Sequence, residues 1–290
     1  MQLISFKKDN NSGFGILSGD QITDLTHTWS GIDDLKDLLA AGLSGLEQVP
    51  LRTDFQLSDV DLLPPIPNPG VIWCAGMNTH SHFAEAKERM GLTELPKQPM
   101  FFLRAPGTIV ASGEAIEKPS KEPAYDYEGE IAIIIGSPCR NVSEADALNH
   151  VAGYSCFNDG SARLYQISSG QMTTGKNAWR SGSFGPVLTT ADSVDLSSLQ
   201  LVSRVNGDVR QTMQLDDLIF SFAYLISHIS EIYHLQPGDV IVTGSAAGVG
   251  AFREPAEFLQ AGDVVEVEAT GLGVLRNTVI DQDHQTHAAA

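Results

Sequence analysis

Short apolar runs, each closed by glycine, proline or an acidic residue, follow one another along most of the chain after residue 70. Runs of this length and spacing predict β-strands rather than helices. The clearest is 131–135, where every residue is apolar, so a buried strand is expected there. We expect strands at 71–75, 100–103, 131–135, 187–188, 201–206, 240–243, 264–269 and 274–280.

Helical periodicity interrupts these strands at four places. One helix is expected to begin near Ser30, to carry apolar residues on one face and to end at Gly42. A second occupies 82–90, and Ser143 begins a short third helix as its cap. The longest covers 215–232, where apolar residues recur at i, i+3 and i+4. This pattern predicts a helix that packs on the core, and we assign no chemistry to it.

The start of the chain is predicted to form a small unit of its own. Strand-like runs at 3–7, 13–17 and 21–25 are separated there by turn signals. The prolines at 64, 65, 67 and 69 cannot lie inside a helix and indicate a stiff connector. We therefore expect an α+β, strand-rich chain. It is divided into a small β/α domain at 1–65, a larger domain at 66–281 and a loose tail at 282–290.

Composition and charge narrow the class of protein. The 290 residues carry a formal net charge of −18. Because phosphate groups and anionic lipids are bound by clustered Lys and Arg, we expect no nucleic-acid partner and no membrane partner. The first residues lack a basic segment followed by an apolar one, and the three cysteines are widely separated. We therefore expect no signal peptide, no disulfide framework and a cytoplasmic protein.

Three acidic residues stand at alternate positions just before the apolar run at 131–135: Asp126, Glu128 and Glu130. Alternate residues of a strand share one side, so these carboxylates are expected to lie close together. Like charges in that position repel, and they persist as anions only if a cation lies between them or one of them takes a proton. Carboxylate oxygens are ligands that suit Mg²⁺, Mn²⁺ or Ca²⁺.

A further carboxylate would strengthen the metal hypothesis, and Asp159 offers one at the end of the apolar run 151–157. The second interpretation is simpler. The acids would stand at a strand end, reach solvent or pair with Lys121 and Arg140. The spacing by itself does not separate these two interpretations.

A second candidate group lies after the expected strand at 71–75. His82 and Glu85 are three residues apart on a predicted helix, so their side chains share a face and can form a hydrogen bond. A carboxylate next to an imidazole raises its basicity and orients it, which makes the histidine a general base. His80 competes for that role. An isolated pair of this kind is also common on solvated helices.

Two glycine-rich segments carry weaker signals. Residues 170–177 nearly match the phosphate-binding pattern GxxxxGK[ST], but Asn177 stands where the hydroxyl for Mg²⁺ is needed, so we reject nucleotide binding. Lys176 remains a candidate cation for an anionic substrate. Residues 243–250 follow an apolar run, and their backbone N–H groups could hold a carboxylate or an oxyanion. This segment matches neither GxSxG nor GxGxxG, which argues against a serine hydrolase and a dinucleotide-binding protein.

Taken in order, six segments resemble the fumarylacetoacetate hydrolase family. They are GMNTHSHFAE (76–85), FLRAP (102–106), DYEGEI (126–131), NDGSARLYQ (158–166), GK (175–176) and GDVIVTGSAAGVG (238–250). The resemblance covers residues 66–281. It implies a mixed β-sandwich catalytic domain of that family's type, a small N-terminal β domain and a homodimer.

The resemblance also implies roles for single residues. The implied ligands of Mg²⁺ or Mn²⁺, with Ca²⁺ as a further possibility, are Glu128, Glu130 and Asp159. The implied catalytic groups, the first two on a segment expected to order as a lid over substrate, are His82, Glu85 and Lys176. The implied contacts to substrate are Asn78, Arg104, Arg163, Gln166, Gly244 and Ser245.

Four positions depart from the family's usual pattern. Thr79 stands where Tyr is common, Arg104 where Lys is common, Leu164 where Asp often occurs, and Ser245 with the following alanine where Thr-Pro is usual. None of these changes removes a metal ligand or the base. Arg104 and Ser245 are among the implied substrate contacts, so the resemblance does not carry over a particular substrate.

The function expected from these features is metal-dependent hydrolysis of a carbon–carbon bond in a small anionic β-diketo acid, such as an acylpyruvate or a fumarylpyruvate. His82 with Glu85 would activate water, and Lys176 would help to hold the departing enolate. The alternative is decarboxylation, isomerisation or hydration of a 2-oxo or 2-hydroxy-dienoate acid through the same enolate. A rival of another class is a non-catalytic binding protein that uses the carboxylates as a structural cation site.

Overall fold

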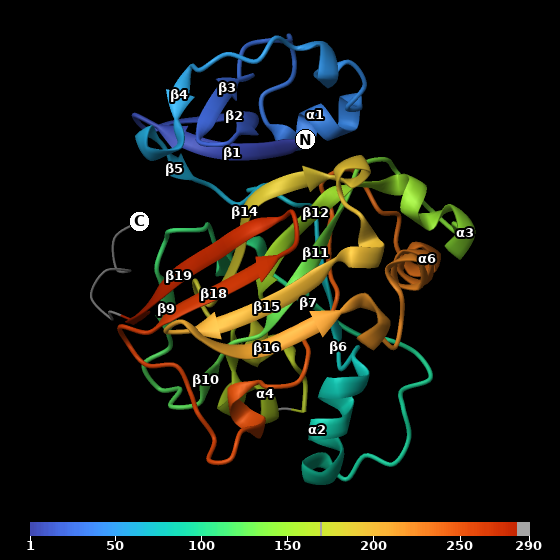
Figure 1. Cartoon of the computed structure of the whole chain (residues 1–290). Coiled ribbons are helices and arrows are strands. Elements are labelled where there is room, and N and C mark those ends of the chain that lie inside the picture. The colour runs from blue at the N-terminus through green and yellow to red at the C-terminus, as the bar shows by residue number, and fades with distance from the viewer. Residues whose placement is uncertain (169, 283–290) are drawn as a thin grey trace.

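Two packed sheets form most of the molecule, whose computed structural model describes residues 1–168 and 170–282 (Figure 1). Ten strands of the larger sheet lie in the order β4-β3-β2-β1-β14-β12-β11-β17-β6-β7, while β5 pairs with β1 and β8 with β14. Residues 283–290 of the expected tail lie outside the described residues. The strands of this sheet are β1 (Gln2–Lys8), β2 (Asn11–Ser18), β3 (Gln21–Asp24), β4 (Phe55–Gln56), β5 (Asp61–Leu62), β6 (Ile72–Gly76), β7 (Met100–Arg104), β8 (Ile109–Val110), β11 (Gly129–Ile135), β12 (Val151–Asn158), β14 (Gly182–Thr190) and β17 (Val240–Val242).

The second sheet, of five strands, covers one face of β11 and β12, as Figure 1 shows. Side chains of both sheets meet in one core, where Leu201 and Val267 pack with Ile131 and Ile133. Each strand that the sequence predicts after residue 70 overlaps an observed strand, and the strand-rich α+β class is confirmed. The remaining strands are, in order across this sheet, β16 (Asp208–Gln214), β15 (Gln200–Val205), β18 (Val264–Ala269), β19 (Gly273–Asp281) and β9 (Ile116–Lys118), and, as a separate pair, β10 (Tyr125–Asp126) and β13 (Ser161–Ala162).

The apolar run that the sequence singles out forms β11, at the centre of the molecule. Ile131, Ile133 and Ile135 face the core shared with the second sheet, while Ala132 and Ile134 face a second core on the opposite side. A strand buried on both faces has no polar alternation, which is why this segment is continuously apolar. Glu128 and Glu130, which come just before the apolar run, are therefore held at the start of a well-packed strand.

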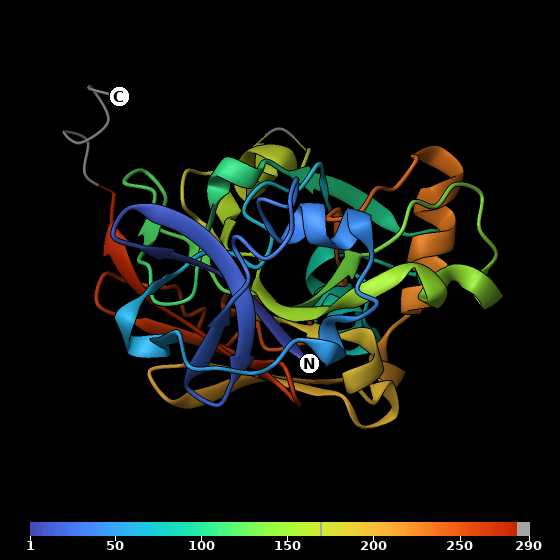
Figure 2. The ribbon, with the colours of Figure 1, turned by 90° about the horizontal axis from the view of Figure 1, so that it is seen from above.

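The N-terminal strands are continuous with the central sheet. β1 pairs antiparallel with β14, and Gln2 and Leu3 lie opposite Thr189 and Leu188. Leu3 also packs in the second core. Figure 2 shows these strands lying across the rest of the molecule, with the connector from 63 to 71 leading from β5 to β6. The domain boundary near residue 65 stays a prediction.

The helices lie around the sheets, and α3 and α6 are together at one side in both views (Figures 1 and 2). None of the helices within the described ranges is long and apolar enough to span a membrane. Ser143 caps α3 as predicted and accepts a hydrogen bond from Asp146 N. The helices are α1 (Leu35–Ala41), α2 (His80–Met90), α3 (Glu144–Ala147), α4 (Arg163–Ser168), α5 (Thr173–Lys176) and α6 (Phe222–Ile232).

Two predicted helices begin later than the sequence suggests. The helix expected from Ser30 begins only at Leu35, because the side chain of Asp34 accepts a hydrogen bond from Asp37 N and caps the helix there. The preceding Gly31 has a positive φ of 78°, which is incompatible with a helix.

The long helix expected at 215–232 begins only at Phe222, and residues 215–217 form an isolated 3-10 turn. The intervening backbone is bound elsewhere. Ile219 N donates to the carbonyl oxygen of Asn78 (2.9 Å), and Phe220 N donates to the Oδ1 atom of Asn78 (2.9 Å). These N–H groups are therefore not available for helical hydrogen bonds, although the apolar periodicity continues through them.

Candidate metal centre and active site

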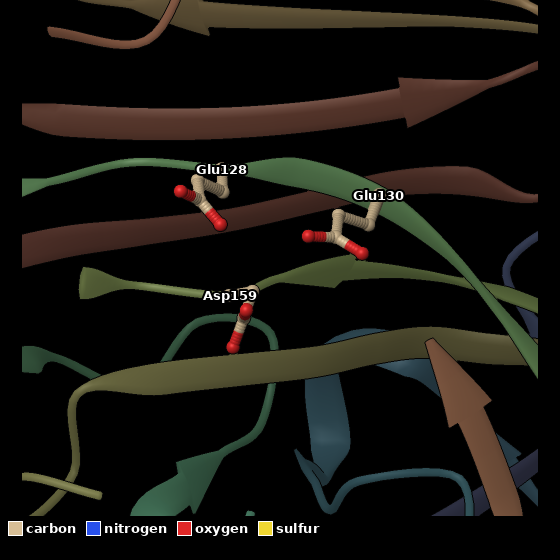
Figure 3. A group of neighbouring side chains, drawn as sticks. All are labelled: Glu128, Glu130 and Asp159. Carbon is tan, nitrogen blue, oxygen red and sulfur yellow. The ribbon is translucent and has the colours of Figure 1, made fainter. Parts of the chain in front are cut away.

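The structure brings Glu128, Glu130 and Asp159 together at the start of β11 and the end of β12 (Figure 3). Glu130 lies in β11, Glu128 directly precedes it, and Asp159 directly follows β12. The antiparallel pairing of β11 and β12 places Gly129 opposite Asn158, so the start of one strand lies beside the end of the other. One carboxylate oxygen from each residue lies within 4.8 Å of the others. All three side chains are buried. We call these three residues the carboxylate cluster.

Asp126, which the strand alternation placed beside the cluster, has a different environment. It lies in β10, and its carboxylate accepts hydrogen bonds from Gly250 N (2.7 Å) and Ala251 N (3.0 Å). It also forms an ion pair with Arg163 (2.7 Å). Asp126 therefore anchors a loop rather than completing the cluster.

Two buried cations, Lys176 and Arg104, and the partly buried Arg163 contact the carboxylate cluster. Lys176 Nζ lies 2.5 Å from an oxygen of Glu128 and 2.6 Å from an oxygen of Asp159. Arg163 binds the other oxygen of Glu128 (2.7 Å), and Arg104 binds the other oxygen of Asp159 (2.6 Å). These are not the cations, Lys121 and Arg140, that the simpler interpretation of the sequence proposed as partners.

These cations affect Glu128, which directly precedes β11, and Glu130, which lies in it, differently. Burial alone would raise the pKa of Glu128, but the charges of Lys176 and Arg163 outweigh it and lower the pKa to about 2. Burial, together with the charges of Asp159 and Glu128, raises the pKa of Glu130 well above its usual range. Within the described residues, Glu130 forms no ion pair and accepts one hydrogen bond, from Gly244 N (2.5 Å).

The cluster therefore fits a hard divalent cation. It offers three carboxylates with oxygen atoms within reach of one ion, which is the donor set that Mg²⁺ and Mn²⁺ prefer. Glu130 is a buried carboxylate without a cationic partner in the described parts of the chain, and a divalent ion would supply one. Glu128, Glu130 and Asp159 would hold such an ion.

Replacing Glu130 with glutamine tests this site directly. We expect the affinity for Mn²⁺ to fall at least about tenfold, because outer-shell substitutions already cost about 10- to 100-fold and this one removes a ligand charge. The metal-free variant should be at least as stable as the native protein, since the amide oxygen can still accept from Gly244 N and a repelling charge is lost. Titration calorimetry and urea unfolding measure the two quantities. Glu117→Gln, which changes a buried glutamate outside the cluster, is the control and should bind Mn²⁺ normally.

The predicted pair of His82 and Glu85 is formed. Nδ1 of His82 lies 2.6 Å from Oε1 of Glu85, and the other carboxylate oxygen accepts from Gly248 N (2.8 Å). The acceptor on Glu85 assigns the proton to Nδ1 and leaves Nε2 as the basic nitrogen. His82 is buried, whereas its competitor His80 is exposed. We call His82 and Glu85 the dyad.

The residues implied as substrate contacts have clear structural partners. The side-chain nitrogen Nδ2 of Asn78 donates hydrogen bonds to the backbone carbonyls of Phe220 (3.1 Å) and Thr243 (2.8 Å). Gln166 accepts a hydrogen bond from Arg163 (3.1 Å). Arg104, Arg163 and Gly244 N contact the cluster as described above. Their roles toward a substrate stay predictions.

Ser245 leads to a residue that the sequence analysis missed, Gln211 of β16. Its amide nitrogen donates to Ser245 Oγ (2.5 Å) and to the carbonyl of Ala246 (2.8 Å). Its amide oxygen accepts from Gly129 N (2.9 Å) and Ser203 Oγ (2.8 Å). The buried side-chain amide of Gln211 therefore joins the backbone of β11 to the glycine-rich loop at 243–250, and both its nitrogen and its oxygen are hydrogen-bonded. A single glutamine in a polar run gives no sequence signal for this role.

Comparisons with known proteins agree with this geometry. The family model described as fumarylacetoacetate (FAA) hydrolase C-terminal matches residues 71–280. A protein of Xenopus laevis named oxaloacetate tautomerase fahd2, mitochondrial, is 34% identical over 293 residues, which span 97% of this chain and 90% of that protein.

Solved structures match over almost the whole chain. The fumarylacetoacetate hydrolase of Exiguobacterium antarcticum superposes with a TM-score of 0.83 at 32% identity and covers 97% of this chain and 100% of its own. A maleylpyruvate hydrolase of Sphingobium sp. SYK-6, in complex with manganese(II) and pyruvate, superposes with a TM-score of 0.77 at 26% identity and covers 98% and 100%. The family model covers well over half of the chain, so the resemblance seen in the six sequence segments is confirmed. The chain therefore belongs to the fumarylacetoacetate hydrolase family of metal-dependent enzymes, and the members similar to it include a tautomerase as well as hydrolases.

Proposed function

We propose that this protein is a metal-dependent isomerase that moves a proton on a small 2-oxo acid, with oxaloacetate keto–enol tautomerisation as the reaction. The observation that supports it best is the dyad, a buried histidine whose Nδ1 lies 2.6 Å from a carboxylate oxygen of Glu85. The 34% identity to a protein named oxaloacetate tautomerase supports the same choice. This reaction belongs to the alternative that the sequence left open, ahead of carbon–carbon bond hydrolysis.

Tautomerisation needs a base beside the substrate carbon and a positive environment for its oxygen. Nε2 of His82 would take the proton from the carbon next to the carbonyl and would return it to the carbonyl oxygen as the enol forms, so that His82 ends the reaction neutral. Lys176 would stabilise the negative charge that develops on that oxygen. Glu128, Glu130 and Asp159 would hold a divalent ion, which would supply Lewis-acid chemistry at the carbonyl. The reaction consumes no water, so the dyad has only to exchange protons.

Hydrolysis of an acylpyruvate is the second candidate. The likeness to a maleylpyruvate hydrolase along 98% of the chain favours it, as does a dyad that could equally activate water. The two reactions differ in their products, because hydrolysis releases pyruvate and tautomerisation releases nothing.

The test measures both reactions with purified protein loaded with Mn²⁺ or Mg²⁺. Decay of the ultraviolet absorbance of enol-oxaloacetate measures tautomerisation, and lactate dehydrogenase with NADH measures pyruvate released from acetylpyruvate or from oxaloacetate. We expect metal-dependent loss of the enol without pyruvate. Pyruvate from acetylpyruvate with no effect on the enol would replace our proposal with the hydrolase. Inactivity in every assay would contradict both.

The homodimer remains an expectation that sedimentation would test.

A further inference from the structure

We propose that Arg89, which belongs neither to the carboxylate cluster nor to the dyad, positions His82 by holding Phe252 against the histidine ring. The inference deepens the proposed function and rests on it only in taking His82 as the base. The segment from 247 to 254, which contains Phe252, is called the clamp segment below.

One face of α2 is bound to the clamp segment along its length. Ser81 Oγ accepts from Ala247 N (3.1 Å), Glu85 accepts from Gly248 N (2.8 Å), and Arg89 donates to the carbonyl of Ala251 (2.9 Å). Glu85 and Arg89 follow His82 by three and seven residues, so all three side chains lie on the same face. The helix that carries the base is thus attached to this segment from its first turn to its last.

Phe252 is a neighbour of both Arg89 and the catalytic histidine. Its ring centroid is 5.7 Å from that of His82, with the two planes tilted by 54°. The guanidinium carbon of Arg89 lies 5.9 Å from the same phenyl centroid. Arg89 also donates to the carbonyls on both sides of Phe252, those of Ala251 (2.9 Å) and Arg253 (3.4 Å). These contacts hold Phe252 and its backbone beside His82.

The other side of the clamp segment is fixed to the core. Asp126 accepts from the backbone N–H groups of Gly250 and Ala251, and Arg163 joins Asp126 to Glu128. Gly250 has no room for a side chain, because an added Cβ would lie 1.9 Å from the carbonyl oxygen of Glu257. A continuous series of bonded groups therefore connects the carboxylate cluster, through the clamp segment, to the dyad.

The position of α2 depends on these polar contacts to an unusual degree. Among the side chains of this helix that the structure describes, those of Phe83 and Ala86 are apolar and buried, and the mean hydropathy of the helix is low. A helix with little apolar burial is held weakly and shifts at small energetic cost. Because a displacement of about 1 Å at a reacting group can cost about 100-fold in rate, the clamp matters for catalysis rather than for folding.

The experiment compares Arg89→Ala with Lys87→Ala, a matched control. Both residues are basic and lie in the last turn of α2, so both variants lose the same charge at the same end of the helix. The exposed side chain of Lys87 forms no hydrogen bond or ion pair with the residues that the structure describes. Arg89→Lys, which keeps the charge but not the paired donors, is the conservative variant.

Two readouts separate positioning from a structural effect. In the tautomerase assay, we expect Arg89→Ala to lower kcat about tenfold while KM and the calorimetric affinity for Mn²⁺ stay within about twofold. Arg89→Lys should recover part of kcat, and Lys87→Ala should match the native protein. In spectra of protein labelled with ¹⁵N-histidine, the proton shared by His82 and Glu85 should give a low-field signal in the native protein and in Lys87→Ala. The signal should be broadened or lost in Arg89→Ala.

Equal behaviour of Arg89→Ala and Lys87→Ala in both readouts would overturn the inference. A parallel loss of Mn²⁺ affinity would do the same, since it would indicate a general structural defect. The spectroscopic comparison needs no substrate. If the native protein fails to act on oxaloacetate, the proposed function fails, while the histidine signal still decides whether Arg89 positions the dyad.

Discussion

Replacing Lys176 with methionine should destabilise the metal-free protein by about 3 kcal/mol and should also lower kcat by about 10²- to 10³-fold at saturating Mn²⁺. The ammonium group is buried and bridges Glu128 and Asp159 at 2.5 and 2.6 Å. Removing one partner of a buried ion pair leaves the other charge uncompensated. The expected loss of unfolding free energy is at the low end of the range for breaking a buried ion pair, because Arg163 and Arg104 still pair with these two carboxylates.

Mn²⁺ should restore most of the stability that Lys176→Met loses, and it should not restore the turnover. The ion replaces the missing positive charge among the carboxylates, but not the donor on the substrate oxygen. Urea unfolding of chelator-treated and Mn²⁺-loaded protein measures the first effect, and the tautomerase assay the second. Lys118→Met, which removes a lysine of a more exposed ion pair, is the control and should cost less than about 1 kcal/mol. Native stability of metal-free Lys176→Met would refute this account of the site.

Replacing His82 with alanine should lower kcat by about 10²- to 10⁴-fold, the range that general acid–base catalysis supplies. The substitution removes the nitrogen that exchanges the proton and leaves Glu85 bound to Gly248 N. The carboxylate cluster does not include His82, so the affinity for Mn²⁺ and the unfolding midpoint should change little. Steady-state kinetics, calorimetry and thermal unfolding of the same preparation measure the three quantities.

His80→Ala provides the matched control for His82→Ala. His80 is also a histidine of the first turn of α2, but its side chain is exposed. We expect native kinetics from this variant. If His80→Ala were inactive and His82→Ala active, the base would be His80. If both kept full activity, the dyad would have no catalytic role, and the hypothesis of a non-catalytic cation-binding protein would gain support.

Local periodicity in the sequence predicts the central strands well, because burial on both faces of β11 requires a continuous apolar run. It also predicts that Glu128 and Glu130 share a side, since they are two residues apart in extended chain, one directly before β11 and one within it. The convergence of Asp159 with them depends on the pairing of β11 with β12. The spacing only allows that pairing, whereas the resemblance to a known family implies it.

Contacts across long sequence separations were not predictable from local patterns. The bridge of Lys176 to Glu128 joins residues 48 positions apart, and it depends on how α5 packs against β7 and β13. The late start of α6 has a similar cause. Apolar periodicity continues through residues 218–220, but the loop around Asn78 binds their backbone, which no pattern within that segment indicates. Gln211 likewise acquires its role only through the packing of two sheets.

The pairing of β1 with β14 has a consequence for any attempt to isolate the larger unit. A fragment that lacked the first 65 residues would leave the edge of β14 unpaired at Leu188 and Thr189. It would also uncover Phe157, Phe184 and Leu188, which share a core with Leu3 and Phe14. An unprotected strand edge next to exposed apolar side chains is a template for intermolecular association. We therefore expect the first 65 residues to protect the rest of the molecule from aggregation, by pairing with the edge of β14 and covering the apolar side chains beside it.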